Sequence, residues 1–475
     1  MKLSTIMGAA MFGAALAAKD SRTFSVMRFN GKEIFNGRLD PIVNPGTTSI
    51  HEHTVFGGSA FGPDATGESL SQSKCTSAKL KGDKSAYWAP RLYFHDKAAG
   101  TFEAVPVFYT NIYYFFEATD DDIVAFPRGL SILAGDASTR TAPSTGSIGN
   151  LDPSNGPVNN VLWTCPRANY DTPAWPAGSD GTTAGIQDPN NKGQGVGFPT
   201  QYCDGFASPL RADIHFPSCY NPKAGLTNYK ENMAWPSSEG ASAGGRTNCP
   251  EGYIHVPHLF MEVYWDTPKF SDRWTPGNGE QPFVLSNGDV TGYSLHADFL
   301  AAWDEDLLQN IIDNCNSAHD GMEACPGVEA HINTEECECE NAATFRTTGS
   351  GAISELPGNN PLSGFSYGAA PAQSSPAPVD TPTQNSSEDE SSEEETVDDS
   401  DAESQPEPES PVDDSPAPAP ATTLAPKPTK DPLCVTRTKT VVETVTVYED
   451  VVPTEAAKKR RHMHMHAARH GARMS

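Results

Sequence analysis

The stretch RLDPIVNPGTTSIHEHTVFGGSAF, residues 38–61, is the part of the chain around which we interpret the rest. Its Asp-Pro and Pro-Gly dipeptides mark turns. The segment from Ile50 to Phe56 then has the pattern of a β-strand. Because side chains alternate between the two faces of a strand, His51 and His53 are predicted to share one face, with Glu52 on the other. Two imidazoles on one face can begin a metal site or an acid–base site.

Segments of β-branched and aromatic residues, separated by turn residues, predict further strands. They are residues 24–35, 105–116, 126–135, 210–219, 255–266 and 283–299. Asn287-Gly288 predicts a hairpin turn inside the last of them. Residues 303–315 have apolar side chains at helical spacing and predict one amphipathic helix. We therefore predict a mainly β domain of sandwich or jelly-roll type, with long loops, one or two edge helices and a disordered tail.

Composition divides the chain into five segments. Residues 1–18 combine a lysine, an apolar run and small residues near the end, as a secretory signal peptide does. The β-rich domain is expected to span residues 24–345. Residues 350–431 are rich in Ser, Pro, Glu and Asp and predict a disordered linker. Residues 432–454 alternate Val and Thr and are strand-prone, and residues 455–475 form a basic tail rich in His and Met.

Charge and hydropathy limit the choice of partners. The formal net charge is -28, but residues 388–414 alone hold 14 acidic residues and no Lys or Arg. The domain is therefore only mildly acidic, which gives no support for nucleic-acid binding. Beyond the signal peptide, no apolar run is long enough to suggest a transmembrane anchor. We expect a secreted, extracellular glycoprotein, glycosylated at Asn385 and displayed at a cell wall by its Ser/Thr/Pro-rich linker.

The chain holds ten cysteines, which in an oxidising compartment are expected to form disulfide bonds. The spacing favours the local pairs Cys219–Cys249 and Cys315–Cys325 and leaves the other connections open. A metal cluster at Cys337-Glu-Cys339 is the alternative for that segment. The cysteines that we assign to disulfides are Cys75, Cys165, Cys203, Cys219, Cys249, Cys315 and Cys325.

Histidines and one aspartate supply the candidate site. His296 and Asp298 share a face of a predicted strand, so Asp298 could orient the His296 imidazole. Our hypothesis is that His51, His53 and His296 converge in one polar cleft, because both stretches border glycine or Asn-Gly turns. The three histidines would then bind copper or zinc, or act with Asp298 as catalytic acid–base residues.

Two further groups of residues have chemistry of interest. Candidate substrate-binding residues are Arg38, Asp40, Trp88 and Tyr293, although ion pairing in a turn and core packing are the ordinary roles of such residues. The tail also carries soft and borderline metal ligands that would suit copper or zinc. They are His462, His464 and His466 with Met463 and Met465.

Several ordered motifs together resemble one family. They are RLDPIVNPG (38–46), DKSAYWAPRLYF (83–94), AFPRGLSILAG (125–135), VPHLFMEVYWDT (256–267) and QPFVLSNGDVTGYSLHADFLAAWD (281–304). The resemblance is to the secreted, mostly fungal family called domain of unknown function 1996, over about residues 28–325. It implies a secreted protein, sometimes attached to wall-binding modules, and it implies no activity.

A second resemblance is confined to the opening stretch. DPIVNPG (40–46), followed by His51 and Val55-Phe56, is similar to the first copper-ligand stretch of the type II copper monooxygenases. In this chain the pair is His-Glu-His rather than two adjacent histidines. Met261 is the residue that would have to supply a methionine ligand.

Three functions stay open, and the sequence does not decide whether the protein is an enzyme. The first is an extracellular protein that acts on or binds cell-wall or plant polysaccharide. The second is a copper- or zinc-binding oxidoreductase that uses His51 and His53. The third is a non-catalytic structural or protective surface protein. The chain has neither the H-E-x-x-H motif of zinc proteases nor a phosphate-binding glycine loop.

The composition of the linker predicts that residues 366–431 lack stable structure. Amide hydrogen exchange measured by mass spectrometry should therefore be fast throughout this span. A protected block of about ten residues or more would contradict the expectation, because protection needs stable hydrogen bonds.

Overall fold

A computed structural model describes residues 24–31, 33–116, 119–169, 171, 173–175, 186–188, 193–206, 209–241, 247–276, 281–339, 345, 351–364 and 434–437. The predicted signal peptide, residues 365–431 of the predicted linker with Asn385, and the His/Met-rich tail lie outside these residues. Among the described residues, no helix is long and apolar enough to cross a membrane.

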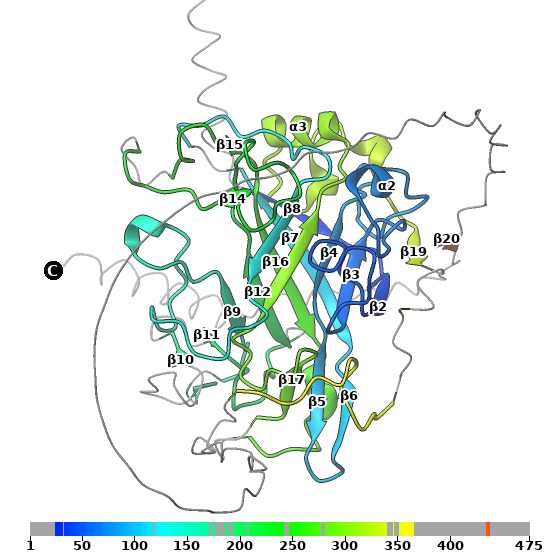
Figure 1. Cartoon of the computed structure of the whole chain (residues 1–475), viewed down its shortest axis with the longest axis vertical. Helices are drawn as coiled ribbons and strands as arrows, with labels where there is room; N and C mark the ends of the chain where they lie inside the picture. Colours follow the sequence, from blue (N-terminus) through cyan, green and yellow to red (C-terminus); the bar gives the residue numbers. More distant parts are fainter. Residues whose placement is uncertain are drawn as a thin grey trace, which may run out of the picture. The chain divides into compact units, whose positions relative to one another are not determined.

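Strands dominate the described part of the chain (Figure 1). The strands are β1 (Phe24–Arg28), β2 (Phe35–Gly37), β3 (His53–Gly57), β4 (Ala86–Pro90), β5 (Leu92–Asp96), β6 (Thr101–Ala104), β7 (Val107–Phe115), β8 (Ser131–Gly135), β9 (Val161–Thr164), β10 (Ile186–Gln187), β11 (Gln194–Val196), β12 (Leu210–His215), β13 (Cys219–Tyr220), β14 (Met233–Ala234), β15 (Ile254–His255), β16 (His258–Trp265), β17 (Phe283–Leu285), β18 (His296–Leu300), β19 (Glu336–Cys339) and β20 (Cys434–Arg437). The helices are α2 (Gly67–Ser71) and α3 (Glu305–Asn314), with short 3-10 turns η1 (Pro153–Asn155), η2 (Thr267–Phe270), η3 (Met322–Ala324) and η4 (Glu329–His331).

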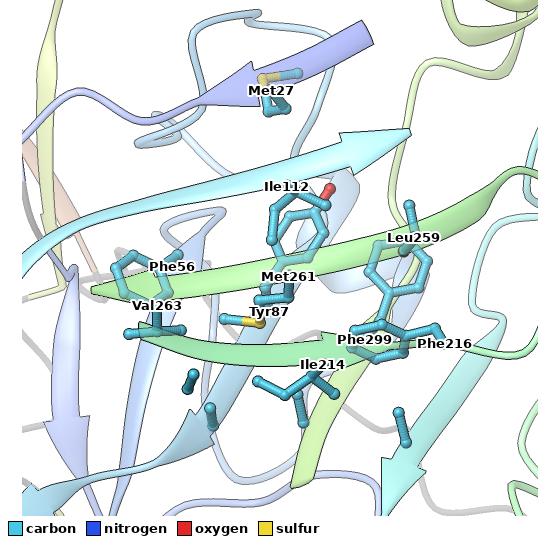
Figure 2. Packing of buried hydrophobic residues seen from close by; sticks show 14 of the residues in the cluster. Met27, Phe56, Tyr87, Ile112, Ile214, Phe216, Leu259, Met261, Val263 and Phe299 are labelled. Carbon is cyan, nitrogen blue, oxygen red and sulfur yellow. The ribbon is translucent and has the colours of Figure 1, made fainter. Parts of the chain in front are cut away.

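Two antiparallel sheets form the centre of the domain. The larger has the strand order β1-β7-β16-β12-β9-β11-β10, and the smaller has the order β2-β3-β4-β18-β8. Figure 2 shows the apolar side chains that pack between them, among them Ile112 and Met261 of the larger sheet and Tyr87 and Phe299 of the smaller. All four are buried, and they belong to one hydrophobic cluster. This face-to-face packing is that of a β-sandwich, so the predicted mainly β fold is confirmed.

The smaller sheet has a second buried face, which positions the candidate site. Strand β18 pairs with β4 on one side and with β8 on the other. Its Ala297 and Phe299 join the core between the sheets, so His296, Asp298 and Leu300 must lie on the opposite face. There Leu300 packs in a separate apolar cluster that includes Trp88 and Phe61. Leu39 from the loop after β2, Phe61 from the loop after β3 and Leu70 from helix α2 join this cluster and cover the face.

Two predictions about local structure need correction. The hairpin around Asn287-Gly288 does not form, because β17 pairs with β5 whereas β18 belongs to the smaller sheet. The tight turn itself is present, with Gly288 at φ 84°, but Gly292 at φ 81° redirects the chain before β18 begins. The second difference concerns residues 351–364, which we assigned to the disordered linker. Residues 351–364 contact the domain through an isolated β-bridge between Phe102 and Ile353, and Leu356 is buried.

Four disulfide bonds stabilise the described domain. They are Cys75–Cys337, Cys165–Cys203, Cys219–Cys249 and Cys315–Cys325. All seven cysteines assigned to disulfides are bonded, and both predicted local pairs are present. The alternative of a metal cluster at Cys337-Glu-Cys339 is wrong, since Cys337 is the partner of Cys75. Cys337 lies in β19, whose backbone pairs antiparallel with that of β20.

The Cys75–Cys337 bond closes the longest loop of the four, with a sequence separation of 262 against 10 for Cys315–Cys325. A Cys75→Ser/Cys337→Ser variant should lose about 2–5 kcal/mol of stability in a denaturant titration. The Cys315→Ser/Cys325→Ser variant is the matched control and should lose less, because a short loop restricts the unfolded chain less. A variant without the long-range bond that unfolds like the wild type would contradict this expectation.

Candidate metal centre

Three histidines meet on the outer face of the smaller sheet. His53 is the first residue of β3 and lies opposite Pro90 of β4. Strand β18 lies on the other side of β4, and Asp298 pairs with Trp88. Two residues earlier, His296 therefore falls in the same row across the sheet as Pro90 and His53. His51 precedes β3 in the chain, and its ring lies beside that of His53, with centroids 4.3 Å apart.

The imidazole nitrogens of these residues converge. Nε2 of His51 lies 3.0 Å from Nε2 of His296. The ring of His296 is 5.0 Å from that of His51 and 5.9 Å from that of His53, measured between centroids. One nitrogen from each residue lies within 4.8 Å of the others. The structure thus brings together the three histidines that we predicted to converge. Glu52 points away from them and forms an ion pair with Arg91 at 2.8 Å.

Two backbone carbonyls determine which nitrogen each ring presents. Nδ1 of His53 lies 2.9 Å from the carbonyl oxygen of Leu39, and Nδ1 of His296 lies 2.7 Å from that of Ser294. A carbonyl oxygen only accepts, so both Nδ1 atoms must carry the proton. In a neutral imidazole the lone pair is then on Nε2. His53 and His296 therefore present Nε2 lone pairs, as histidine ligands of metals do when a carbonyl holds the other nitrogen.

Burial keeps these imidazoles neutral. His53 is fully buried, and His51 and His296 expose only 8% and 3% of their surfaces. Burial is the main cause that lowers the pKa of His53 to about 3 and that of His296 to about 4. It also lowers the pKa of His51 well below its usual value, with a further effect from the neighbouring His53. Neutral imidazoles are the form that binds metal ions.

Two carboxyl groups border the same cluster. Ligand atoms of Asp40, His53 and Asp298 lie within 4.8 Å of one another. Both oxygens of Asp298 are buried and lack a hydrogen-bond partner among the described residues, as does Nε2 of His53. Burial, together with the charge of Asp40, raises the pKa of Asp298 well above its usual value. Burial also raises the pKa of Asp40, although its side chain accepts hydrogen bonds from the backbone of Ile42 and Val43.

The predicted orientation of His296 by Asp298 is wrong. The Ser294 carbonyl holds the His296 ring instead. Nδ1 of His296 is already bound to that carbonyl, and neither Asp298 oxygen has a hydrogen-bond partner among the described residues. Asp298 lies instead on the His53 side of the cluster, where its carboxyl group is within 4.8 Å of ligand atoms of His53 and Asp40.

Most of the predicted substrate-binding residues are structural. Nε of Arg38 donates to the carbonyl of Ser49, 2.7 Å away, and so fixes the loop before His51. Trp88 is fully buried in the outer-face cluster. Tyr293 is one of the residues that line a cavity of about 400 Å³. Met261 is in the core between the two sheets, so it is not a ligand of this cluster (Figure 2).

Other histidines form separate pairs. Nδ1 of His255 lies 3.0 Å from Asp121, and Nε2 lies 3.4 Å from the hydroxyl of Ser218. Asp121, His255 and Ser218 are thus arranged like the Asp-His-Ser triad of a serine hydrolase. Ser218 is only 1% exposed, however, so no substrate can reach its hydroxyl. His258 pairs with His215 across two strands at 3.0 Å. Neither pair adjoins the His51, His53 and His296 cluster.

Sequence reasoning missed the groups that hold the cluster in place. The carbonyls of Leu39 and Ser294 carry no signal in the sequence, because every residue has one. The segment 351–364 is a second omission. The Asn360 amide donates to the carbonyl of Ile50, 3.0 Å away, and a side chain at Gly358 would clash with the same oxygen. This segment therefore packs directly over the residue that precedes His51.

Comparison with known proteins gives a family. The sequence profile of the domain of unknown function 1996 matches residues 40–303. The chain belongs to this family. Asp40, His51, His53, His296 and Asp298 all lie inside the matched region, whereas the segment 351–364 lies outside it. Searches of curated proteins and of solved structures returned no match.

The lowered histidine pKa values predict how the metal-free protein responds to acid. Between the folded values, about 3 for His53 and about 4 for His296, and the ordinary ~6.5, the unfolded chain binds more protons than the folded one. This contribution to stability is present above pH ~6.5 and is lost as the pH falls. A His53→Gln variant should show a shallower loss of thermal stability between pH ~6.5 and ~4.

Asp298→Asn is the contrasting variant. The raised pKa of Asp298 contributes stability that is fully present below pH ~3.9 and is lost as the pH rises. Removing this opposing contribution should make the acid loss steeper than in the wild type. Identical pH profiles for the wild type and both variants would show that the cluster does not titrate as described.

Proposed function

We propose that this protein binds one late transition metal ion, copper or zinc, through His51, His53 and His296. The observation that carries the proposal is the convergence of buried, neutral imidazoles whose Nδ1 protons are fixed by Leu39 and Ser294. Imidazole ligands suit copper and zinc, whereas magnesium and calcium prefer oxygen ligands.

The spacing of the nitrogens supports the same site. Two nitrogens that bind one zinc ion at ~2.0–2.1 Å can be at most ~4.2 Å apart. The separation of 3.0 Å between the Nε2 atoms of His51 and His296 is within this limit. His53 needs only a small shift to complete three ligands, because all three nitrogens lie within 4.8 Å of one another.

Electrostatics favour a cation at this position. The metal-free cluster leaves Nε2 of His53 and both Asp298 oxygens without a hydrogen-bond partner among the described residues. Each unpaired buried polar group costs about 1–3 kcal/mol. A divalent ion would satisfy the His53 lone pair directly and would favour the ionised form of the nearby Asp298, which burial otherwise disfavours. Cation binding thus removes the main unfavourable feature of this face of the sheet.

The metal decides the chemistry that is available. Copper held by three imidazoles could change oxidation state, which would support the oxidoreductase hypothesis. Zinc has no redox chemistry, and in a closed site it would stabilise the fold. The low exposure of all three histidines favours a closed site, with His51, at 8%, as the most accessible ligand.

We further propose that the protein is secreted, of fungal origin and extracellular, with a cell-wall or plant polysaccharide as its partner. Four disulfide bonds in the described domain support an oxidising compartment. Residues 1–18 have the composition of a signal peptide. A structural or protective role at the wall agrees with a closed metal site as well as an enzymatic role does.

Metal content tests the proposal. The protein to be tested is the full chain, produced without an affinity tag and with His462, His464 and His466 replaced by Ala. It should bind one equivalent of copper or zinc per chain, as measured by elemental mass spectrometry. These tail replacements remove a second candidate binder. Adding His53→Ala should abolish the bound metal, whereas His215→Ala should not, because His215 lies in a separate histidine pair.

Two further results would support or contradict the site. Affinity should hold from neutral pH down to about 4, the lowered pKa of His296, and should fall below that pH, where protons compete for the imidazoles. Metal that stays bound in the His53→Ala variant would place the binding site elsewhere. A chain that takes up no copper or zinc after exposure to either ion would contradict the proposal directly.

A further inference from the structure

A cavity of about 400 Å³ is lined by residues of both sheets and of their loops. One wall is the end of β8, the edge strand of the smaller sheet, from Leu133 to Asp136. The opposite wall comes from the larger sheet and its loops, with Val161 of β9 and Val196 of β11. Trp235 and Tyr293 complete it. The volume is in the range of ~300–1,000 Å³ that small-molecule sites occupy.

The lining has the chemistry of a site for neutral, polyhydroxylated molecules. It combines two aromatic side chains, Trp235 and Tyr293, with amides at Asn159 and Asn160, a hydroxyl at Thr139 and the carboxyl group of Asp136, which can also accept hydrogen bonds from sugar hydroxyls. No Lys, Arg or His is among the described residues that line it, so nothing there would attract a phosphate or a uronic acid. Aromatic rings pack on the apolar faces of sugars, and amides and hydroxyls bond their hydroxyl groups.

Hydrogen bonds hold the lining in place before any ligand arrives. The Asn159 amide donates to the Ile148 carbonyl at 2.9 Å, and the Asn160 amide donates to the His215 carbonyl at 2.8 Å. The indole of Trp163 donates to the carbonyl of Gly292 at 2.9 Å, which fixes the turn before Tyr293. A lining ordered in advance reduces the entropy that binding would cost.

The cavity adjoins the metal centre through one glycine. Gly135 lines the cavity and pairs with His296 across the β8–β18 ladder. A side chain at Gly135 would clash with the Leu295 carbonyl and would come within 3.1 Å of Cβ of His296. The backbone of Gly135, at φ 81°, is therefore the thin wall between the two.

From these observations, we infer that the cavity is a subsite for a neutral hexose glycan. Trp235 is the principal stacking residue, because it is half-buried and its ring has only an edge contact with His258, at 6.5 Å. Thr139 and the two asparagines supply the polar contacts. This inference rests on the proposed polysaccharide partner and names the place where that partner would bind. It does not require a bound metal, because the backbone of Gly135 separates the cavity from His296.

Calorimetric titration of the full chain tests the subsite. The probes are cellohexaose, laminarihexaose and chitohexaose, each titrated into the wild type. At least one should bind, and Trp235→Ala should weaken its affinity tenfold or more. Thr139→Val should weaken it several-fold, because the hydroxyl is lost without a change of shape. Trp274→Ala is the matched control, a half-buried tryptophan in a different cavity of about 260 Å³, and should bind like the wild type.

The His53→Ala variant separates this inference from the proposed metal site. It should keep its glycan affinity while losing its metal. A wild-type protein that holds metal but binds none of the three probes would overturn the subsite and leave the metal proposal intact. Equal affinity in the wild type and Trp235→Ala, or loss of binding in Trp274→Ala alone, would also overturn it.

Discussion

The pairing of β18 between β4 and β8 is the constraint on which the rest of the structure depends. Its five residues alternate between the two faces of the smaller sheet, so one strand serves both hydrophobic clusters. Ala297 and Phe299 fill the core against the larger sheet, whereas His296 and Asp298 are held on the other face. A shift of one residue would exchange these sets and place two polar side chains in the sandwich core. The register of β18 with β4 and β8 therefore determines both the packing of the core and the positions of His296 and Asp298.

The cluster is costly to maintain without a cation. Asp298 is fully buried with both oxygens unpaired, and its neighbour Asp40 is also buried. Such a group persists only where the surroundings are strongly stabilised or where a ligand compensates it. The surroundings here include the outer-face cluster and the Cys75–Cys337 bond, which connects the segment after β3 and α2 to β19. The covalent bond and the apolar cover therefore retain an arrangement that electrostatics alone would disfavour.

The sequence predicted the parts of the site that follow from local periodicity. The common face of His51 and His53, the strand that carries His296, and helix α3 all follow from repeats of two or 3.6 residues. The convergence of the two stretches was inferred from their glycine turns, and the structure places their rings together. The sequence could not indicate that Ser294 rather than Asp298 would hold His296, because that choice depends on the path of the chain before β18. Trp235 and Asn159 come from loops that lack periodicity, so only tertiary contacts bring them to one cavity.

The relation between the cavity and the metal centre limits what kind of function the pair can have. A metal bound at the Nε2 atoms would lie on the outer face of the smaller sheet, beneath the loop of His51. The proposed glycan subsite is the cavity at the edge of that sheet, and the backbone of Gly135 lies between the two. Direct attack by the metal on a sugar in the cavity would require a path through that backbone. The two proposed sites would therefore bind their ligands independently, and an oxidative role for a bound metal would need access from the side of His51.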